Sequence, residues 1–198
     1  MKSHWLIIIS SVSLLIGVSL GYLQEPSPEA VSERIAANLE KELSAIDQDA
    51  SALINQFREQ DTLRLLPLSE YPFFHYRNRE LISWSDNSFI FPGSALSGNF
   101  SLRFFKIPDG DFLVKKWKLE ADFLVAVLSL HRRYSIQNNY LSPAWNWQIF
   151  GDGEFIIYDI NGAADVPVCI NNNCLYKLGF SQDSFPAQES EALLAILF

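Results

Sequence analysis

The chain has 198 residues and a net charge of −8, with 48% hydrophobic and 19% charged residues. This length allows one ordinary domain with a helical appendage, and the apolar fraction is too high for a disordered chain. Because 23 acidic residues outnumber 15 basic ones, the sequence lacks the basic surface that nucleic acid requires, and we expect no nucleic-acid partner. Three histidines and two cysteines, without a CxxC or HExxH motif, predict neither a metal site nor a cofactor.

Residues 5–23 form an uncharged, apolar run near the N-terminus. As a helix this run would cover about 28 Å, close to the roughly 30 Å hydrocarbon thickness of a bilayer. Lys2 precedes the run and acidic residues such as Glu25 follow it, so the positive-inside rule places residues 1–4 in the cytoplasm and the remainder outside. The run therefore predicts a transmembrane anchor. The alternative is a cleaved signal peptide, which would also export the rest of the chain.

The segment 24–60 is typical of a long helix. Ser27 is expected as its N-cap and Pro28 as its first helical residue. Apolar residues recur with helical spacing, which becomes a heptad pattern in the second half: Val31, Ile35, Leu39, Leu43, Ile46, Ala50, Leu53 and Phe57. These apolar residues form a stripe along one face of the helix, and two interpretations of it stay open. The stripe either packs on the chain's own domain or forms a membrane-proximal stalk that pairs residues 31–57 in a homodimer.

Residues 61–188 change to short, aromatic-rich segments with turn residues between them. The pattern predicts strands at 72–76, 81–84, 100–107, 112–119, 123–130, 154–160, 166–170 and 175–180. One helix followed by a meandering antiparallel sheet is an α+β fold. On an exported and tethered chain, the architecture that we expect is a PAS-like sensor domain of the Cache type.

Cys169 and Cys174 flank an Asn-rich turn between two predicted strands. Export would place them in an oxidising compartment, and their spacing allows a cross-strand disulfide. Two free, buried thiols are the alternative interpretation. Neither interpretation gives the pair a role in redox catalysis.

Two segments resemble a known family. Residues 74–87 read FHYRNRELISWSDN, an aromatic strand, a polar turn and a second strand, and residues 112–141 combine a strand pair with RYSIQNNYL. Both are similar to extracytoplasmic input regions of bacterial membrane-bound two-component histidine kinases. The resemblance implies a periplasmic sensor domain, anchored in the bacterial inner membrane, whose kinase module is absent from this chain. The apolar end of residues 189–198 is then expected to begin a second transmembrane helix, and a short complete protein is the alternative.

Candidate ligand-binding residues lie in the same two segments. Trp84 offers a flat surface, Asp86 offers fixed acceptors, and Arg132 presents a planar fork that suits carboxylates. The full candidate set consists of Trp84, Asp86, Asn87, Arg132, Tyr134, Asn139 and Tyr140. Core packing or the closing of a turn is the alternative role for these residues.

The leading hypothesis is a signal-sensing domain that passes the binding of a small molecule or protein through the helix to the kinase module. An anchored, exported binding module, for example for glycans through Trp145 and Trp147, is the alternative. A third hypothesis, an exported enzyme, would require a carboxylate site that unites His75 with His131. We expect no enzymatic activity, because the sequence contains no recognisable catalytic motif.

Overall fold

The computed structural model describes residues 27–60, 69–86, 91, 93–134, 142–153, 155–164 and 166–180. The predicted membrane run 5–23 and the terminal segment 189–198 lie outside these residues. None of the described helices is long and apolar enough to cross a bilayer. The described chain has an α+β fold, with one long N-terminal helix and two antiparallel sheets.

The long helix α2 (Pro28–Gln60) contains 33 residues. It begins as expected, because the Ser27 hydroxyl accepts a hydrogen bond from the Ala30 backbone N–H at 3.2 Å. Glu29 lies in the first turn and Arg58 in the last, where each charge interacts favourably with the helix dipole. The prediction of one long helix that ends near residue 60 is confirmed.

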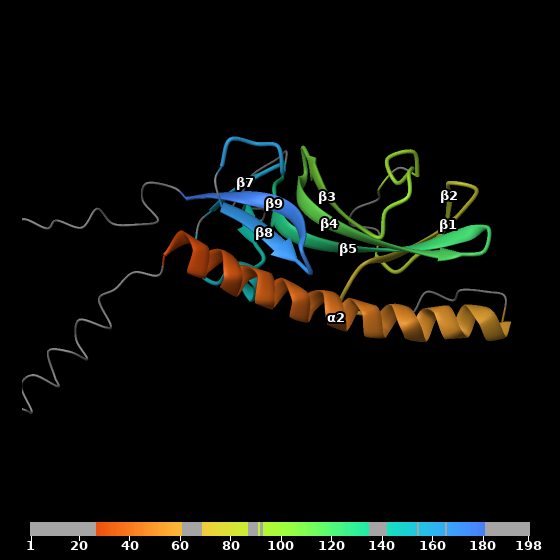
Figure 1. Cartoon of the computed structure of the whole chain (residues 1–198). Coiled ribbons are helices and arrows are strands. Elements are labelled where there is room, and N and C mark those ends of the chain that lie inside the picture. Colours follow the sequence, from red (N-terminus) through yellow and green to blue (C-terminus); the bar gives the residue numbers. More distant parts are fainter. Residues whose placement is uncertain are drawn as a thin grey trace, which may run out of the picture.

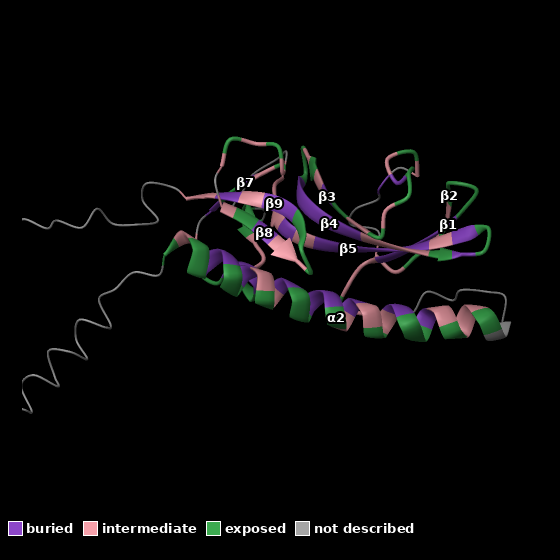
Figure 2. Cartoon of the chain, in the orientation of Figure 1, coloured by how far each residue is buried: buried purple, intermediate pink, exposed green. Residues whose placement is uncertain are grey.

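The apolar stripe of α2 packs against the sheets of the same chain (Figure 2). Seven stripe residues are no more than 5% exposed: Val31, Ile35, Leu39, Leu43, Ile46, Ala50 and Leu53. Packing on the chain's own domain is therefore the role that the structure gives to this stripe. Pairing with a second copy through residues 31–57 stays a prediction, and it would have to use the exposed, polar face of the helix.

Six strands form the larger sheet: β1 (Phe73–Arg77), β2 (Glu80–Trp84), β3 (Leu102–Ile107), β4 (Gly110–Leu119), β5 (Asp122–Arg132) and β6 (Ala144–Trp145). The first five lie in the order β2-β1-β5-β4-β3, and the short β6 pairs with β5. All pairings are antiparallel. The predicted strands in this region are present, with boundaries displaced by one or two residues.

Three strands form a smaller, separate sheet in the order β7-β9-β8: β7 (Phe155–Tyr158), β8 (Val166–Ile170) and β9 (Asn173–Phe180). The one-turn helix α3 (Trp147–Phe150) connects the two sheets. The sequence predicted the strands of this second sheet but neither β6 nor α3.

Two hairpins turn on pairs of residues in the left-handed region. Asn78 and Arg79 have φ angles of 50° and 71° between β1 and β2, and Asn171 and Asn172 have φ angles of 49° and 64° between β8 and β9. Two consecutive positive φ angles give the backbone twist that joins antiparallel strands by the shortest loop. Asn adopts this region more readily than most residues, which explains the Asn-rich turns.

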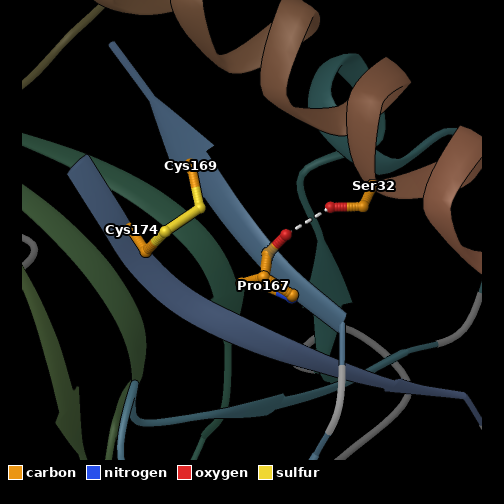
Figure 3. The surroundings of a disulfide bond; sticks show 4 residues. All are labelled: Ser32, Pro167, Cys169 and Cys174. Atoms are coloured by element: carbon orange, nitrogen blue, oxygen red, sulfur yellow. Dashed lines mark hydrogen bonds between the residues drawn. A yellow bond between two sulfur atoms is a disulfide. The ribbon is translucent and has the colours of Figure 1, made fainter. Parts of the chain in front are cut away.

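The second of these hairpins carries the disulfide (Figure 3). Cys169 and Cys174 are direct cross-strand partners on β8 and β9, with Cα atoms 3.8 Å apart. The structure therefore has the bridged arrangement and not the pair of free thiols. Beside it, the Ser32 hydroxyl of α2 donates to the Pro167 carbonyl oxygen of β8 at 2.6 Å, so this hairpin is also bound to the helix.

Both faces of the larger sheet are covered (Figure 1). Helix α2 lies along one face, where it forms a core with side chains such as Phe73 and Leu124. Segment 93–101 lies over the opposite face, whose core consists of Phe74, Tyr76, Phe91, Leu96, Phe112, Val114, Val125 and Val127. Successive residues of β5 alternate between the two cores, as the pleat of a strand requires.

Candidate functional site

The structure brings two of the predicted ligand-binding residues together. Asp86, which follows β2, and Arg132, at the end of β5, line one cavity of about 260 Å³. Trp84 is 47% exposed and does not line this cavity, and Tyr134 is half-buried beyond β5. The remaining candidates lie outside the described residues: Asn87, Asn139 and Tyr140.

Polar groups from three parts of the chain complete this cavity, which we call the Asp86–Arg132 cavity. Tyr71 precedes β1, Ser129 lies in β5, and Asn146 and Gln148 lie at the start of α3. Phe112 and Val127 contribute apolar surface from the sheet. A small cavity with both charge signs and several hydrogen-bonding groups is suited to a polar ligand.

One wall of the Asp86–Arg132 cavity is bound directly to α2. The Tyr71 hydroxyl donates to Glu42 Oε2 at 2.8 Å, and Glu42 is 8% exposed on the buried side of the helix. Burial, together with this hydrogen bond, raises the pKa of Tyr71 well above its usual value. The phenol therefore remains a neutral donor, and the buried carboxylate keeps its partner.

A second wall is bound to α2 through α3. The Asn146 side chain accepts from the Gln148 backbone N–H at 3.1 Å as the N-cap of α3, and donates to the Ser129 carbonyl oxygen at 3.0 Å. One turn later, the Ile149 carbonyl oxygen accepts a hydrogen bond of 3.1 Å from Asn38 of α2. The sequence gave no signal for this connection, because Asn38 and Ile149 are 111 residues apart.

A larger cavity, of about 640 Å³, lies between the β1–β2 turn, segment 93–101 and the β4–β5 hairpin. Three basic residues line it, Arg79, Lys116 and Lys118. Lys115 and Lys116 are consecutive residues of β4. The structure separates the two, because Lys115 pairs with Asp47 of α2 at 2.6 Å whereas Lys116 points to the opposite face of the sheet.

His75 and His131 lie in two separate clusters at opposite ends of β5. His75 Nε2 is 2.8 Å from Asp122 Oδ2, and the Arg77 guanidinium binds the same carboxylate at 2.9 to 3.1 Å. These bonds from Arg77, followed by the bond from His75, hold the pKa of Asp122 below its usual value. The hydroxyl of Ser83, the direct cross-strand neighbour of His75, is buried and has no hydrogen-bond partner among the described residues.

At the other end of β5, Arg133 donates to Asp111 Oδ1 at 3.1 Å, and His131 Nδ1 lies 3.6 Å from Asp111 Oδ2. The His131 ring stacks on Trp145 with centroids 4.2 Å apart. Burial lowers the pKa of His131 despite the nearby carboxylate. Because His75 and His131 are held in different clusters, they do not form the joint site on which the enzyme hypothesis depended.

Trp145 and Trp147 do not form a shared aromatic surface. Trp145 packs between His131 and Phe150, whereas Trp147 is 73% exposed. Within the part of the chain that the structure describes, no group of three or more histidine, cysteine or acidic side chains could hold a metal ion. The chain matches no known protein family, no curated protein and no solved structure.

Proposed function

We propose that this chain is the extracytoplasmic signal-sensing domain of a membrane-bound sensor histidine kinase. Residues 5–23 would anchor it in the bacterial inner membrane, and α2 would carry the signal toward a kinase module that is not part of this chain. The order β2-β1-β5-β4-β3, with one long helix along one face, is the arrangement expected of a PAS-like module, which supports this proposal.

The observation that carries the proposal is the double attachment of the Asp86–Arg132 cavity to α2. One wall reaches the helix through Tyr71 and Glu42, and the other reaches it through α3 and Asn38. A ligand that prefers one arrangement of these walls would favour one position of the helix, by no more than its difference in affinity for the two arrangements. The ligand is a small molecule or a protein segment.

The position of the two ends of the described chain also supports the proposal. Helix α2 begins, and β9 ends, at the same end of the molecule (Figure 1). An anchor before α2 and a second membrane segment after β9 would therefore both attach at this end and leave the whole domain on one side of the membrane. A sensor that signals through a bilayer requires this geometry.

The first test is the location of the domain. A single cysteine introduced as Gln48→Cys, on the exposed face of α2, is expected to react with a membrane-impermeant maleimide in cells with a permeabilised outer membrane. The native cysteines are bonded to each other and do not compete. Reaction only after lysis of the inner membrane would overturn the proposal.

The second test concerns coupling. When residues 1–198 are fused to a kinase core, Tyr71→Phe and Asn38→Ala should each change the basal reporter output several-fold, because each removes one attachment of the cavity to α2. Gln48→Ala is the matched control on the exposed face of the same helix. Output that is unchanged in both variants would contradict the role of these attachments.

A further inference from the structure

The 640 Å³ cavity has a chemistry of its own, distinct from that of the Asp86–Arg132 cavity. The three basic residues at its wall come from separate elements: Arg79 from the β1–β2 turn, and Lys116 and Lys118 from β4. These three cations stand in contrast to the net charge of −8 of the whole chain. Opposite charge attracts small anions into a cleft with apolar walls, and Phe100 and Phe123 provide such walls here.

Lys116 is the central cation of this cavity. Its ammonium donates to the Leu96 carbonyl oxygen at 3.1 Å and to the Gly98 carbonyl oxygen at 2.6 Å. It also lies 4.1 Å from the ring centroid of Phe100 and 5.7 Å from that of Phe123. Carbonyls and rings orient this charge without neutralising it, and no carboxylate of the described residues pairs with it.

The two acidic residues at the cavity wall cancel only part of this charge, because one is already paired and the other offsets a single cation. The carboxylate of Asp122 is already bound by Arg77 and His75. Glu120 lies exposed in the β4–β5 turn and forms no ion pair with a described residue. Arg79 and Lys118 are likewise exposed and have no ion-pair partner within the described part of the chain, so their donors are available to a ligand.

We propose that this cavity is a binding site for a small oxyanion, either an organic carboxylate or a phosphate. Lys116, with two of its three N–H groups on backbone carbonyls, has one left for a ligand oxygen. Arg79 offers a planar fork that binds two oxygens of one carboxylate or phosphate, and Lys118 adds a further donor. The site stands on its own chemistry and does not depend on the proposed signalling function.

Titration of the purified full chain with sodium acetate, sodium succinate or inorganic phosphate tests this proposal, with calorimetry at constant ionic strength. Saturable binding in the millimolar range or tighter, with neutral acetamide and succinamide silent, is expected. A response to the carboxylates alone or to phosphate alone identifies the class of anion, and either supports the site. No saturable binding of any anion, or equal binding of the neutral amides, would overturn it.

Substitutions at the wall of this cavity test whether the anion binds there. Lys116→Met should weaken the affinity by about tenfold or more, because it removes a charge-assisted hydrogen bond. Arg79→Gln and Lys118→Gln, at exposed positions where folding is not at risk, should each weaken it several-fold. Lys177→Met is the control, because Lys177 also donates to a carbonyl, that of Gly162 at 3.2 Å, but outside the cavity. Unchanged affinity in the Arg79 and Lys118 variants would overturn the site.

Discussion

The two His–Asp–Arg clusters at the ends of β5 use the same residue types in different geometries. At one end, His75 and Asp122 have side chains that are 4% exposed, and their nearest atoms are 2.8 Å apart. At the other end, the distance between His131 and Asp111 is 3.6 Å, longer than a hydrogen bond, and the imidazole stacks on Trp145 instead. The same charges therefore produce a tight cluster and a loose one.

The backbone explains this difference. Arg77 and Asp122 are direct partners in a regular stretch of the β1–β5 pairing, so their side chains meet without distortion. Asp111 and His131 are also partners, but the register shifts between Asp111 and Phe112. A bulge turns side chains away from their regular direction, which leaves room for Arg133 and holds the histidine less closely. The regular β1–β5 pairing thus holds the tight cluster as a structural lock, and the β4–β5 bulge holds the loose one.

The largest effect is expected from Asp122→Asn. The Asn side chain would carry no negative charge and would place an NH2 donor close to the donors of His75 and Arg77 in a buried position. We therefore expect the free energy of unfolding to fall by about 3 kcal/mol. Urea denaturation followed by tryptophan fluorescence measures this loss. Asp152→Asn, an exposed position, is the control and should change stability by less than about 0.5 kcal/mol. An Asp122 variant as stable as this control would show that the cluster is not a lock.

A smaller effect is expected from Asp111→Asn. Asp111 is also buried, at 2% exposure, but Arg133 keeps a second partner in the Ile107 carbonyl oxygen at 3.0 Å. His131 loses no hydrogen bond, because its distance to the carboxylate is already 3.6 Å. We therefore expect a loss of about 2 kcal/mol in the same denaturation experiment. A loss greater than that of Asp122→Asn would reverse the ranking of the two clusters.

The contributions of the two clusters to the stability of the fold should change in different pH ranges. Burial lowers the pKa of His131 below 6.5 in the folded chain. As the pH drops through 6.5, the unfolded chain therefore takes up a proton before the folded chain does, and the stability falls. The pKa of Asp122 is lowered below 3.8, chiefly by Arg77, so its contribution is present above 3.8 and is lost at more acidic pH.

His131→Gln separates these two ranges. The variant should have a flatter stability profile between pH 7 and pH 5 than the wild type, and the same loss of stability below pH 4. Urea midpoints measured across this pH range provide the comparison. A profile that is unchanged near pH 6 would mean that Asp111, which raises the pKa of His131, balances the burial that lowers it.

Local pattern was enough to predict most elements of this fold, although not β6 or α3. Ser27 and Pro28 marked the start of α2, and the spacing of its apolar residues identified the face that is buried. The Asn-rich turn between Cys169 and Cys174 placed the two cysteines on paired strands. These features depend on residues that are close in sequence, where short-range sterics and hydrogen bonds decide the backbone.

Long-range pairing decides the rest, and the sequence carries little signal for it. Asp122 meets its partners only because β1 lies beside β5, and Lys116 lines a cavity only because strand alternation turns it away from α2. Asp86 and Arg132 were predicted separately as ligand-binding residues, on chemistry alone. That they line one cavity follows from the strand order, which no local pattern encodes.

The smallest expected effect concerns the aromatic neighbour of each histidine. Trp145 stacks on His131 at 4.2 Å, whereas Phe57 of α2 meets the edge of His75 at 5.8 Å. Trp145→Leu should cost about 1 kcal/mol and should raise the pKa of His131 toward 6.5, because the ring that buries the imidazole is lost. Phe57→Leu, the matched control, should leave the His131 titration unchanged while costing a similar amount. The two imidazoles can be followed separately by NMR, and a His131 titration that does not move in Trp145→Leu would mean that the strand, and not the indole, keeps water from this ring.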